Sequence, residues 1–278
     1  MQRVLLTNYH SWQCDFKKSS FIINYFHGLD KKINRESKKF KISSFIREKL
    51  FLNFNKYDFI ITNNQITKDY FIKDGFREDN IAILKNGFPS ISNIKINNNF
   101  TRSLNQNKIK VIGVGRLGLR KGGKDFCEFA KYIDNDRYEF SYLGVVKNPN
   151  DIKYYKDMED YVKLPGHVDN IYDYLLDADI AIHFSHQETG SLILREMMSV
   201  GLPIIAWDIQ TVTEDLAHQS DLLIPIGNFQ EAKNKLLYLS DNLDIRREIG
   251  LKSIALSKKY TSKDMYNNFI EILSRAKK

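Results

Sequence analysis

The first hundred residues alternate between short apolar runs and longer polar stretches. The apolar runs occupy residues 4–7, 21–26, 59–62 and 81–84, and the stretches between them are compatible with helices. This alternation is typical of βα units, in which a helix returns the chain to the start of the next strand. The pattern therefore predicts an α/β lobe at the amino-terminal end.

From residue 111 the alternation becomes more regular. Strands are predicted at residues 111–114, 140–146, 162–164, 180–184, 203–207 and 222–225. Helices are predicted between them, at residues 124–133, 171–176, 192–200 and 231–239. The strand segments are apolar throughout, which indicates a parallel sheet covered by helices on both faces. We expect a doubly wound α/β domain whose ligands lie beyond the carboxyl ends of the strands.

Composition marks a boundary between these two regions. Residues 90–108 are rich in Asn, Ser and Lys and poor in apolar residues, which is typical of a linker. A chain of 278 residues also exceeds the usual size of a single core. We therefore predict one lobe at residues 1–105, a second at 106–260 and, at 261–278, a closing amphipathic helix.

The net charge of +8 comes from the first lobe. Residues 1–105 carry 18 Lys and Arg against 9 Asp and Glu, whereas the remainder carries 24 against 25. The densest basic stretch spans residues 31–49. A solvated helix face explains it as well as a surface for an anionic membrane, a phosphorylated acceptor or nucleic acid does.

Cysteine usage and hydropathy narrow the class of protein. Cys14 and Cys127 lie far apart and in different predicted lobes, which favours two reduced thiols over a disulfide or a cysteine-built metal site. No apolar run is long enough to span a membrane, and residues 1–10 lack the build of a signal peptide. We expect a cytoplasmic protein, either free or held peripherally at the inner face of the membrane.

Glycines and cations crowd the segment after the first strand of the second lobe. Residues 115–123 read Gly-Arg-Leu-Gly-Leu-Arg-Lys-Gly-Gly. Glycine lets a ligand approach the backbone, a helix start offers free N–H groups, and Arg or Lys neutralises phosphate. The segment is neither a Walker A loop nor Gly-x-Gly-x-x-Gly. Taken alone, it favours a diphosphate site and a solvated basic turn equally.

A second polar group follows the strand predicted at residues 180–184. Glu188 lies on the predicted loop, and Glu196 about two turns inside a helix that we expect to start near Gly190. The N–H groups of Gly190, Ser191 and Leu192 would then face the same ligand as the two carboxylates. Because glutamate is a good helix former, this spacing alone favours a merely solvated helix face.

Together the two segments resemble the family 4 glycosyltransferases, also called glycosyl transferases group 1, which have the GT-B fold. The family's Gly-Arg-Leu and Lys-Gly elements correspond to residues 115–117 and 121–122, and its two glutamates with seven residues between them to Glu188 and Glu196. Further elements follow the family's order at residues 165–168, 178–185 and 201–203 and at Glu214. The resemblance implies two Rossmann-like, doubly wound parallel-sheet lobes that face a cleft, with the amino-terminal lobe abbreviated.

The resemblance also implies a role for each site residue. Gly115, Arg116 and Lys121 would bind the diphosphate of the donor. Glu188 would contact the sugar hydroxyls and Glu196 the ribose hydroxyls. The other implied donor contacts are Gly166, His167 and Val168 beside the base, and the amides of Gly190, Ser191 and Leu192.

Catalysis would rest on Arg116, Lys121 and Glu188, with the two cations in the role that a metal fills elsewhere. No metal is then required, in keeping with the absence of an Asp-x-Asp pair. His27 follows a predicted strand and is similar to the family's histidine that faces the donor sugar, so we include it as a catalytic-site contact. The alternative is a structural histidine beside a turn. His183 lies on an apolar strand and is predicted to be a core residue.

The sequence departs from the family at several positions. The first lobe has about 100 residues and no recognisable glycine-rich loop on the acceptor side. Gly190, Ser191, Arg195 and Met197 stand where the family usually has other residues. These differences leave the identities of the sugar and of the acceptor open.

We therefore predict a glycosyltransferase that moves a sugar from a nucleotide-diphosphate sugar to a glycan, a lipid-linked glycan or another acceptor, as in polysaccharide biosynthesis. The resemblance implies retention at the anomeric carbon, no metal and no cofactor besides the nucleotide sugar as co-substrate. Two alternatives stay open. One is an inactive donor-binding or partner subunit, and the other is a glycosyltransferase that modifies nucleic acid through the basic lobe.

Overall fold

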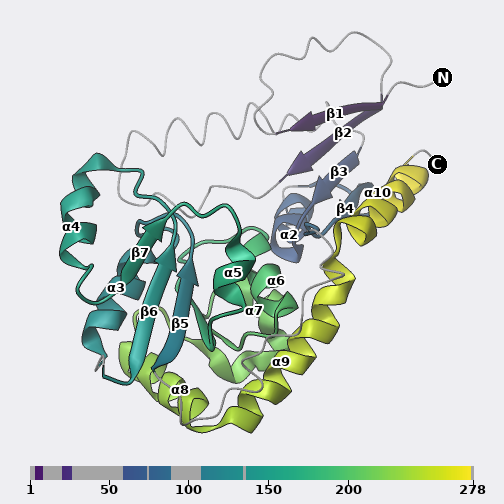
Figure 1. Ribbon diagram of the computed structural model, residues 1–278. Helices are drawn as coiled ribbons and strands as arrows, with labels where there is room; N and C mark the ends of the chain where they lie inside the picture. The colour runs from purple at the N-terminus through teal and green to yellow at the C-terminus, as the bar shows by residue number, and fades with distance from the viewer. Residues whose placement is uncertain are drawn as a thin grey trace. The chain divides into compact units, whose positions relative to one another are not determined.

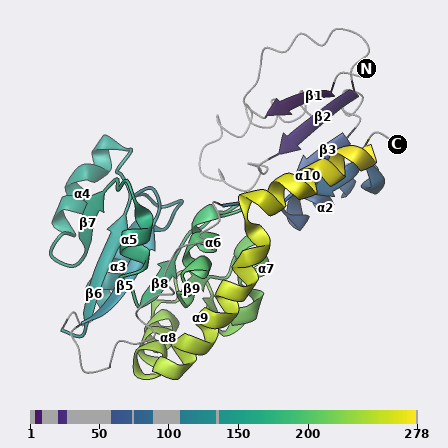
Figure 2. The same ribbon diagram turned by 45° about the vertical axis from the view of Figure 1, so that its right-hand side comes forward.

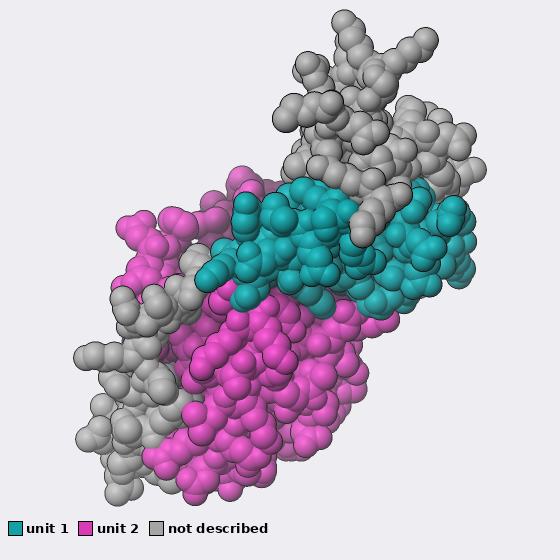
Figure 3. Space-filling view, turned by 90° about the vertical axis from the view of Figure 1, so that its right-hand side faces the viewer, with its two compact units in different colours: residues 1–87, 262–278 teal, residues 88–261 magenta. Residues whose placement is uncertain are grey.

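The computed structural model describes residues 4–8, 21–26, 59–73, 75–88, 108–133 and 136–276. By its internal contacts the chain forms two compact units, one of residues 1–87 and 262–278 and the other of residues 88–261 (Figure 3). His27, the basic stretch and most of the predicted linker lie outside the described residues. The lobe boundaries predicted at residues 105 and 260 therefore stay predictions.

The four apolar runs of the first unit form one parallel sheet (Figure 1). Its strands, in spatial order, are β1 (Val4–Asn8), β2 (Phe21–Phe26), β3 (Phe59–Thr62) and β4 (Ile81–Ile83). Helix α2 (Gln65–Lys73) and the 3-10 turn η3 (Glu78–Asn80) connect β3 to β4. The carboxyl-terminal helix α10 (Ser262–Ala276) contributes Ile272 to the apolar cluster formed by these strands.

The second unit contains a six-stranded sheet in which all strand pairs are parallel. The spatial order is β10-β9-β8-β5-β6-β7. The strands are β5 (Ile109–Val114), β6 (Tyr138–Leu143), β7 (Lys163–Gly166), β8 (Ile180–His183), β9 (Ile204–Trp207) and β10 (Leu223–Ile224). The order changes direction between the neighbours β5 and β8, which is the arrangement of a doubly wound fold.

Helices cover both faces of this sheet (Figures 1 and 2). One apolar core lies under α3 (Gly123–Tyr132), α4 (Ile152–Asp157) and α8 (Phe229–Asp241). A second core lies under α5 (Ile171–Leu175), α6 (Leu192–Ser199) and α7 (Gln210–Leu216). Helix α9 (Leu243–Ser257) packs against α6. The described residues of this unit also form 3-10 turns at η5 (Pro149–Asp151), η6 (Ala217–Leu222) and η7 (Lys258–Tyr260).

Aromatic side chains dominate the first core. Phe184 stacks on Trp207 with ring centroids 3.8 Å apart, and Phe129 meets Phe184 edge to face. Both rings of the stacked pair are buried. Aromatic pairs of this kind stabilise a fold by about 1 kcal/mol beyond the area that they bury. They hold the carboxyl ends of β8 and β9 together.

The structure corrects the expected depth of Glu196 and the end of one strand. Helix α6 begins at Leu192, as its predicted range has it, and not near Gly190, from which the depth of Glu196 was counted; Gly190 has φ 143° and Ser191 is extended. Glu196 therefore lies about one turn inside the helix, not two. Strand β6 ends at Leu143 rather than at residue 146. There the backbone of Gly144 comes so close to the carbonyl of Gly115 that a Cβ would lie 1.7 Å from its oxygen.

None of the helices among the described residues is sufficiently long and apolar to cross a membrane.

Gly122 locks the loop after β5 against the end of β8. Its φ is 73°, in the left-handed region, and a Cβ at this position would lie 2.1 Å from the carbonyl oxygen of Phe184. Only glycine combines this conformation with so close an approach of two backbones. The glycine therefore fixes the position of its neighbour Lys121 relative to β8.

We predict that Gly122→Ala destabilises the protein far more than Gly227→Ala does. Both glycines are left-handed, with φ 73° and 82°, so alanine is strained at either position. Nothing lies within 4 Å of a Cβ at Gly227. In urea denaturation we expect a loss of about 1 kcal/mol for Gly227→Ala and about 3 kcal/mol or more for Gly122→Ala. Equal losses would contradict the packing argument.

Candidate functional site

The loops that follow β5 and β8 lie side by side at the carboxyl edge of the sheet. Backbone N–H of His186 and the hydroxyl of Ser185 both donate to the carbonyl of Arg120, at 3.0 Å. The hydroxyl of Tyr142 on β6 donates to the carbonyl of Lys121 at 2.9 Å. These bonds, with the close approach at Gly122, hold the two loops in one arrangement.

Lys121 and Glu188 form an ion pair between these loops. The ammonium lies 2.7 Å from one carboxylate oxygen and 2.8 Å from the other. The side chain of Glu188 is 5% exposed, whereas that of Lys121 is 27% exposed. The structure thus joins one residue of each predicted segment, and the lysine keeps access to solvent.

His183 is a second partner of Glu188, although the sequence pattern predicts only a core residue at this position. It is buried at the end of β8, with Nε2 3.1 Å from Oε1 of Glu188. The two atoms are within hydrogen-bonding distance, although the direction of the contact is not that of a well-formed hydrogen bond. The only signal in the sequence was a polar residue at the end of an apolar strand, five positions before a candidate glutamate.

These partners keep the Glu188 carboxyl ionised. Burial acts to raise its pKa, but the close contact and charge of His183 and the ammonium of Lys121 outweigh burial and lower the pKa to about 2. A permanently ionised carboxylate accepts hydrogen bonds and does not donate a proton. Glu188 is therefore suited to holding hydroxyl groups and unsuited to acting as a general acid.

Helix α6 begins next to this pair, and the side chain of its N-cap residue does not cap it. The N-cap residue Ser191 makes no side-chain capping bond, and the first turn contains no acidic residue. Free N–H groups at a helix start attract anions. Glu196 follows one turn later, where burial raises its pKa. Burial and the nearby charge of Glu196 raise the pKa of Tyr172 on α5 to about 12.

Arg195 anchors α6 through its buried side chain. Its guanidinium is fully buried and donates to Asp215 at the end of α7, with Nη2 3.2 and 3.3 Å from the two carboxylate oxygens. It also lies over the ring of Tyr260, 4.7 Å from the centroid. A buried charge with these partners fixes geometry more than it stabilises the fold. The unusual residue at this position thus ties α6 to α7 and to the turn after α9.

The remaining expected donor residues all lie at the carboxyl edge. Gly115 and Arg116 directly follow β5, and Arg116 is exposed, with no ion pair to any described residue. Gly166 ends β7, two strands away from β5, and His167 and Val168 follow it. His167 is exposed, whereas Val168 packs against the second core.

A histidine and an aspartate form another contact beside the site. Nε2 of His186 lies 2.8 Å from Oδ2 of Asp125 in the first turn of α3. The indole N–H of Trp207 donates to the same oxygen at 3.0 Å. The aspartate thus connects the loop after β8 with α3 and the end of β9, which explains His186 as a structural residue.

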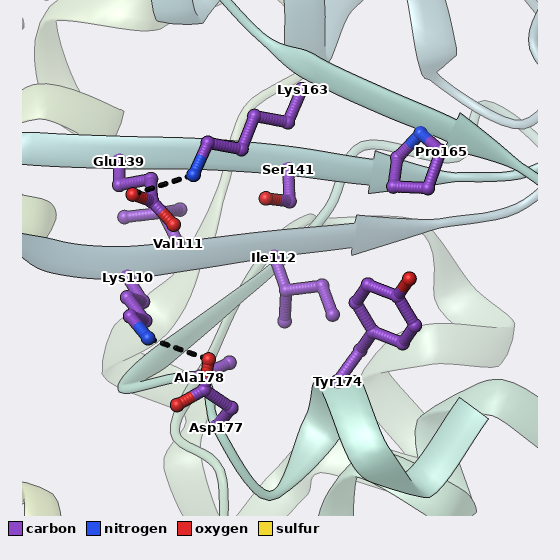
Figure 4. Close-up of a pocket in the computed structure, with 10 residues that line it drawn as sticks. All are labelled: Lys110, Val111, Ile112, Glu139, Ser141, Lys163, Pro165, Tyr174, Asp177 and Ala178. Carbon is purple, nitrogen blue, oxygen red and sulfur yellow. Dashed lines mark hydrogen bonds and ion pairs between the residues drawn. The ribbon is translucent and has the colours of Figure 1, made fainter. Parts of the chain in front are cut away.

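A groove of about 370 Å³ lies elsewhere, beside α5 on the face of β5, β6 and β7 (Figure 4). Its charged side chains face each other in two ion pairs, Lys110 with Asp177 at 2.6 Å and Lys163 with Glu139 at 2.8 Å. None of the expected donor residues lines it. The groove is therefore separate from the site formed by Lys121 and Glu188.

In the part of the chain that the structure describes, no three His, Cys, Asp or Glu side chains are grouped so that they could hold a metal ion. The site instead presents cations and amides for an anion, and carboxylates for hydroxyl groups. A ligand with phosphate and polyhydroxyl parts has the matching chemistry.

Residues 108–242 match the model of the family described as glycosyl transferases group 1. The match includes both loops of the site and the whole of the sheet. Over these residues the second unit is therefore similar to the glycosyl transferases of group 1.

Two curated relatives extend this comparison. An uncharacterised 41.2 kDa protein in the cps region of Klebsiella pneumoniae is 25% identical over 226 residues, 77% of this chain and 61% of the relative. The processive diacylglycerol alpha-glucosyltransferase of Acholeplasma laidlawii is 31% identical over 134 residues, 47% of this chain and 40% of the relative. The chain thus matches three fifths or so of the length of the first relative and less of the second.

The fold is shared with solved structures. The Anabaena protein Alr3699/HepE, crystallised with UDP and glucose, superposes with a TM-score of 0.72 at 18% identity, over 92% of this chain and 72% of that protein. The predicted fold class, α/β with parallel sheets of the GT-B type, is thereby confirmed.

We predict that Glu188→Gln destabilises the protein at neutral pH and that this difference shrinks in acid. The pKa of Glu188 falls from 4.5 to about 2 on folding, so its ionisation stabilises the fold above pH 4.5 and ceases to do so as the pH falls towards 2. Urea midpoints of the two proteins, compared from about pH 7 to about pH 3.5, should converge.

Glu196→Gln is the matched control for this measurement. Burial raises the pKa of Glu196, so its ionisation opposes folding and the variant should gain stability relative to the wild type as the pH rises. A Glu188→Gln difference that is independent of pH, or one that follows Glu196→Gln, would refute the ion-pair interpretation.

Proposed function

We propose that the second unit binds a nucleotide-diphosphate sugar and that the protein transfers its sugar to a glycan, a lipid-linked glycan or another hydroxyl acceptor. The observation that carries this proposal is the Lys121–Glu188 pair at the carboxyl edge of the sheet, next to the start of α6. A cation, an uncapped helix start and two carboxylates suit a ligand that has phosphates between two groups of hydroxyls.

The relatives support the choice of a first donor. The Acholeplasma protein is named a glucosyltransferase that acts on diacylglycerol, and the Anabaena structure contains UDP and glucose. We propose UDP-sugars, beginning with UDP-glucose, as donors for this chain. A membrane contact through the basic first lobe and a cytoplasmic location are part of the same proposal.

In the proposed reaction the bond between C1 of the sugar and the diphosphate oxygen breaks, and its electron pair passes to that oxygen. Arg116, Lys121 and the N–H groups at the start of α6 stabilise the growing negative charge without a metal ion. The acceptor oxygen bonds to C1 on the face that the diphosphate leaves, and the acceptor proton passes to the departing phosphate. The configuration at C1 is retained.

The carboxylates orient the donor in this proposal. Glu188 accepts hydrogen bonds from sugar hydroxyls and Glu196 from the ribose. Neither is proposed as a nucleophile. His27, expected from the sequence to face the donor sugar, lies outside the described residues and stays a prediction.

We predict that Lys121→Ala and Glu196→Ala each lower the rate of transfer at least about 100-fold, because each removes a group that holds the donor or stabilises the leaving group. Transfer from radiolabelled UDP-glucose measures the effect, and circular dichroism checks the fold. Lys124→Ala is the control, since Lys124 lies three positions after Lys121, in the first turn of α3, but pairs with Asp151. Normal turnover in Lys121→Ala would remove the assignment.

We predict further that one class of nucleotide sugar raises the melting temperature of the wild type. Ligand at about 100 times its Kd adds roughly 2.7 kcal/mol to the free energy of unfolding. A thermal-shift screen of nucleotide sugars therefore identifies the donor, and the same screen on Lys121→Ala should give no shift. Identical shifts in both proteins would place the binding site elsewhere.

A further inference from the structure

Glu188 has two basic partners that differ in their freedom to move. The side chain of Lys121 is 27% exposed and that of His183 is 2% exposed. A lysine ammonium on its flexible stem turns to a new anion without a backbone shift. The imidazole of His183 is buried at the end of β8, and close packing allows it no comparable movement.

The backbone on both sides of the pair is held in place. The Lys121 carbonyl accepts the hydroxyl of Tyr142 at 2.9 Å, and the Glu188 carbonyl accepts the hydroxyl of Thr211 at 3.0 Å. Gly122 is pressed against the carbonyl of Phe184. Of the three side chains, only that of Lys121 is therefore able to rearrange when an anion arrives.

We propose that the Lys121 ammonium moves from Glu188 to the diphosphate when a nucleotide sugar binds, and that His183 is the positioning residue that keeps the carboxylate directed at the sugar. This inference rests on the proposed function. A buried carboxylate that loses every partner is strongly unfavourable, so the lysine is free to leave only because His183 stays. The ion pair seen here is then the resting state of the site.

The exchange makes the sugar and the diphosphate depend on each other. A diphosphate without a sugar competes with Glu188 for the Lys121 ammonium and offers the carboxylate no hydrogen-bond donor to replace it. A nucleotide sugar supplies hydroxyls that replace the lost ammonium. The site therefore favours the intact donor over the nucleotide product that is left after transfer.

Calorimetric titration with UDP and UDP-glucose tests the exchange. Glu188→Gln frees the lysine, so we expect it to bind UDP about fivefold more tightly than the wild type does and UDP-glucose about tenfold more weakly. If Glu188 merely repelled the diphosphate, Glu188→Gln would also tighten UDP binding, but it would do so in the absence of Lys121 as well. In the Lys121→Met background the exchange predicts that Glu188→Gln leaves the UDP affinity unchanged.

His183→Leu tests the positioning role. We expect it to weaken UDP-glucose binding about tenfold and UDP binding less than threefold or so, because only the sugar contact depends on Glu188. His183→Gln, which keeps an N–H donor at similar reach, should restore most of the loss. His186→Leu is the matched control, since His186 pairs with Asp125 instead. Equal losses for both ligands in His183→Leu would overturn the positioning role.

A measurement without ligand separates this inference from the proposed function. If His183 supports Glu188, His183→Leu lowers the melting temperature of the wild type more than that of Glu188→Gln. Equal lowering overturns the positioning role whether or not a donor binds. A wild type that binds neither probe refutes a UDP donor and the exchange, whereas binding of both with no change in Glu188→Gln refutes the exchange alone.

Discussion

The site depends on the pairing of β5 with β8, the point at which the order of the sheet reverses. The chain leaves β5 for α3 on one face and leaves β8 for α6 on the other. The loops that follow β5 and β8 therefore start side by side and diverge immediately, which is why doubly wound sheets bind ligands at such points. Here the contact between Gly122 and Phe184 brings Lys121 to Glu188, and the rest of the site is arranged around that pair.

Burying charged side chains is unfavourable for the stability of this arrangement, but the same side chains fix its geometry. Glu188 and Arg195, on either side of the start of α6, are both almost fully enclosed. An eight-residue helix does not hold its own position in water. Arg195 contacts both Asp215 and Tyr260. These contacts fix the direction of α6 more closely than apolar packing alone would. The residue that departs from the family pattern is thus part of the frame of the site.

The elements that could be predicted from the sequence are those whose burial is apolar. Every predicted strand is present, and β3, β8 and β9 are short, largely apolar runs that are buried along their whole length. The helix α9 was missed although it has 15 residues, because it buries Arg246, Gly250, Ser253 and Ser257 rather than a periodic apolar face. The depth of Glu196 inside α6 was overestimated because Gly190 takes a backbone angle that its neighbours in sequence do not reveal.

The sequence by itself determined the fold class, the strands and the two segments that carry the site. These features are encoded by local patterns of glycine, charged and apolar residues along the chain. Only the tertiary structure decided which side chains meet. It paired Lys121 with Glu188, placed His183 behind them and anchored Arg195 on Tyr260, contacts that span from 5 to 67 positions in the sequence. Such contacts follow from the order of strands in the sheet, and no local pattern records that order.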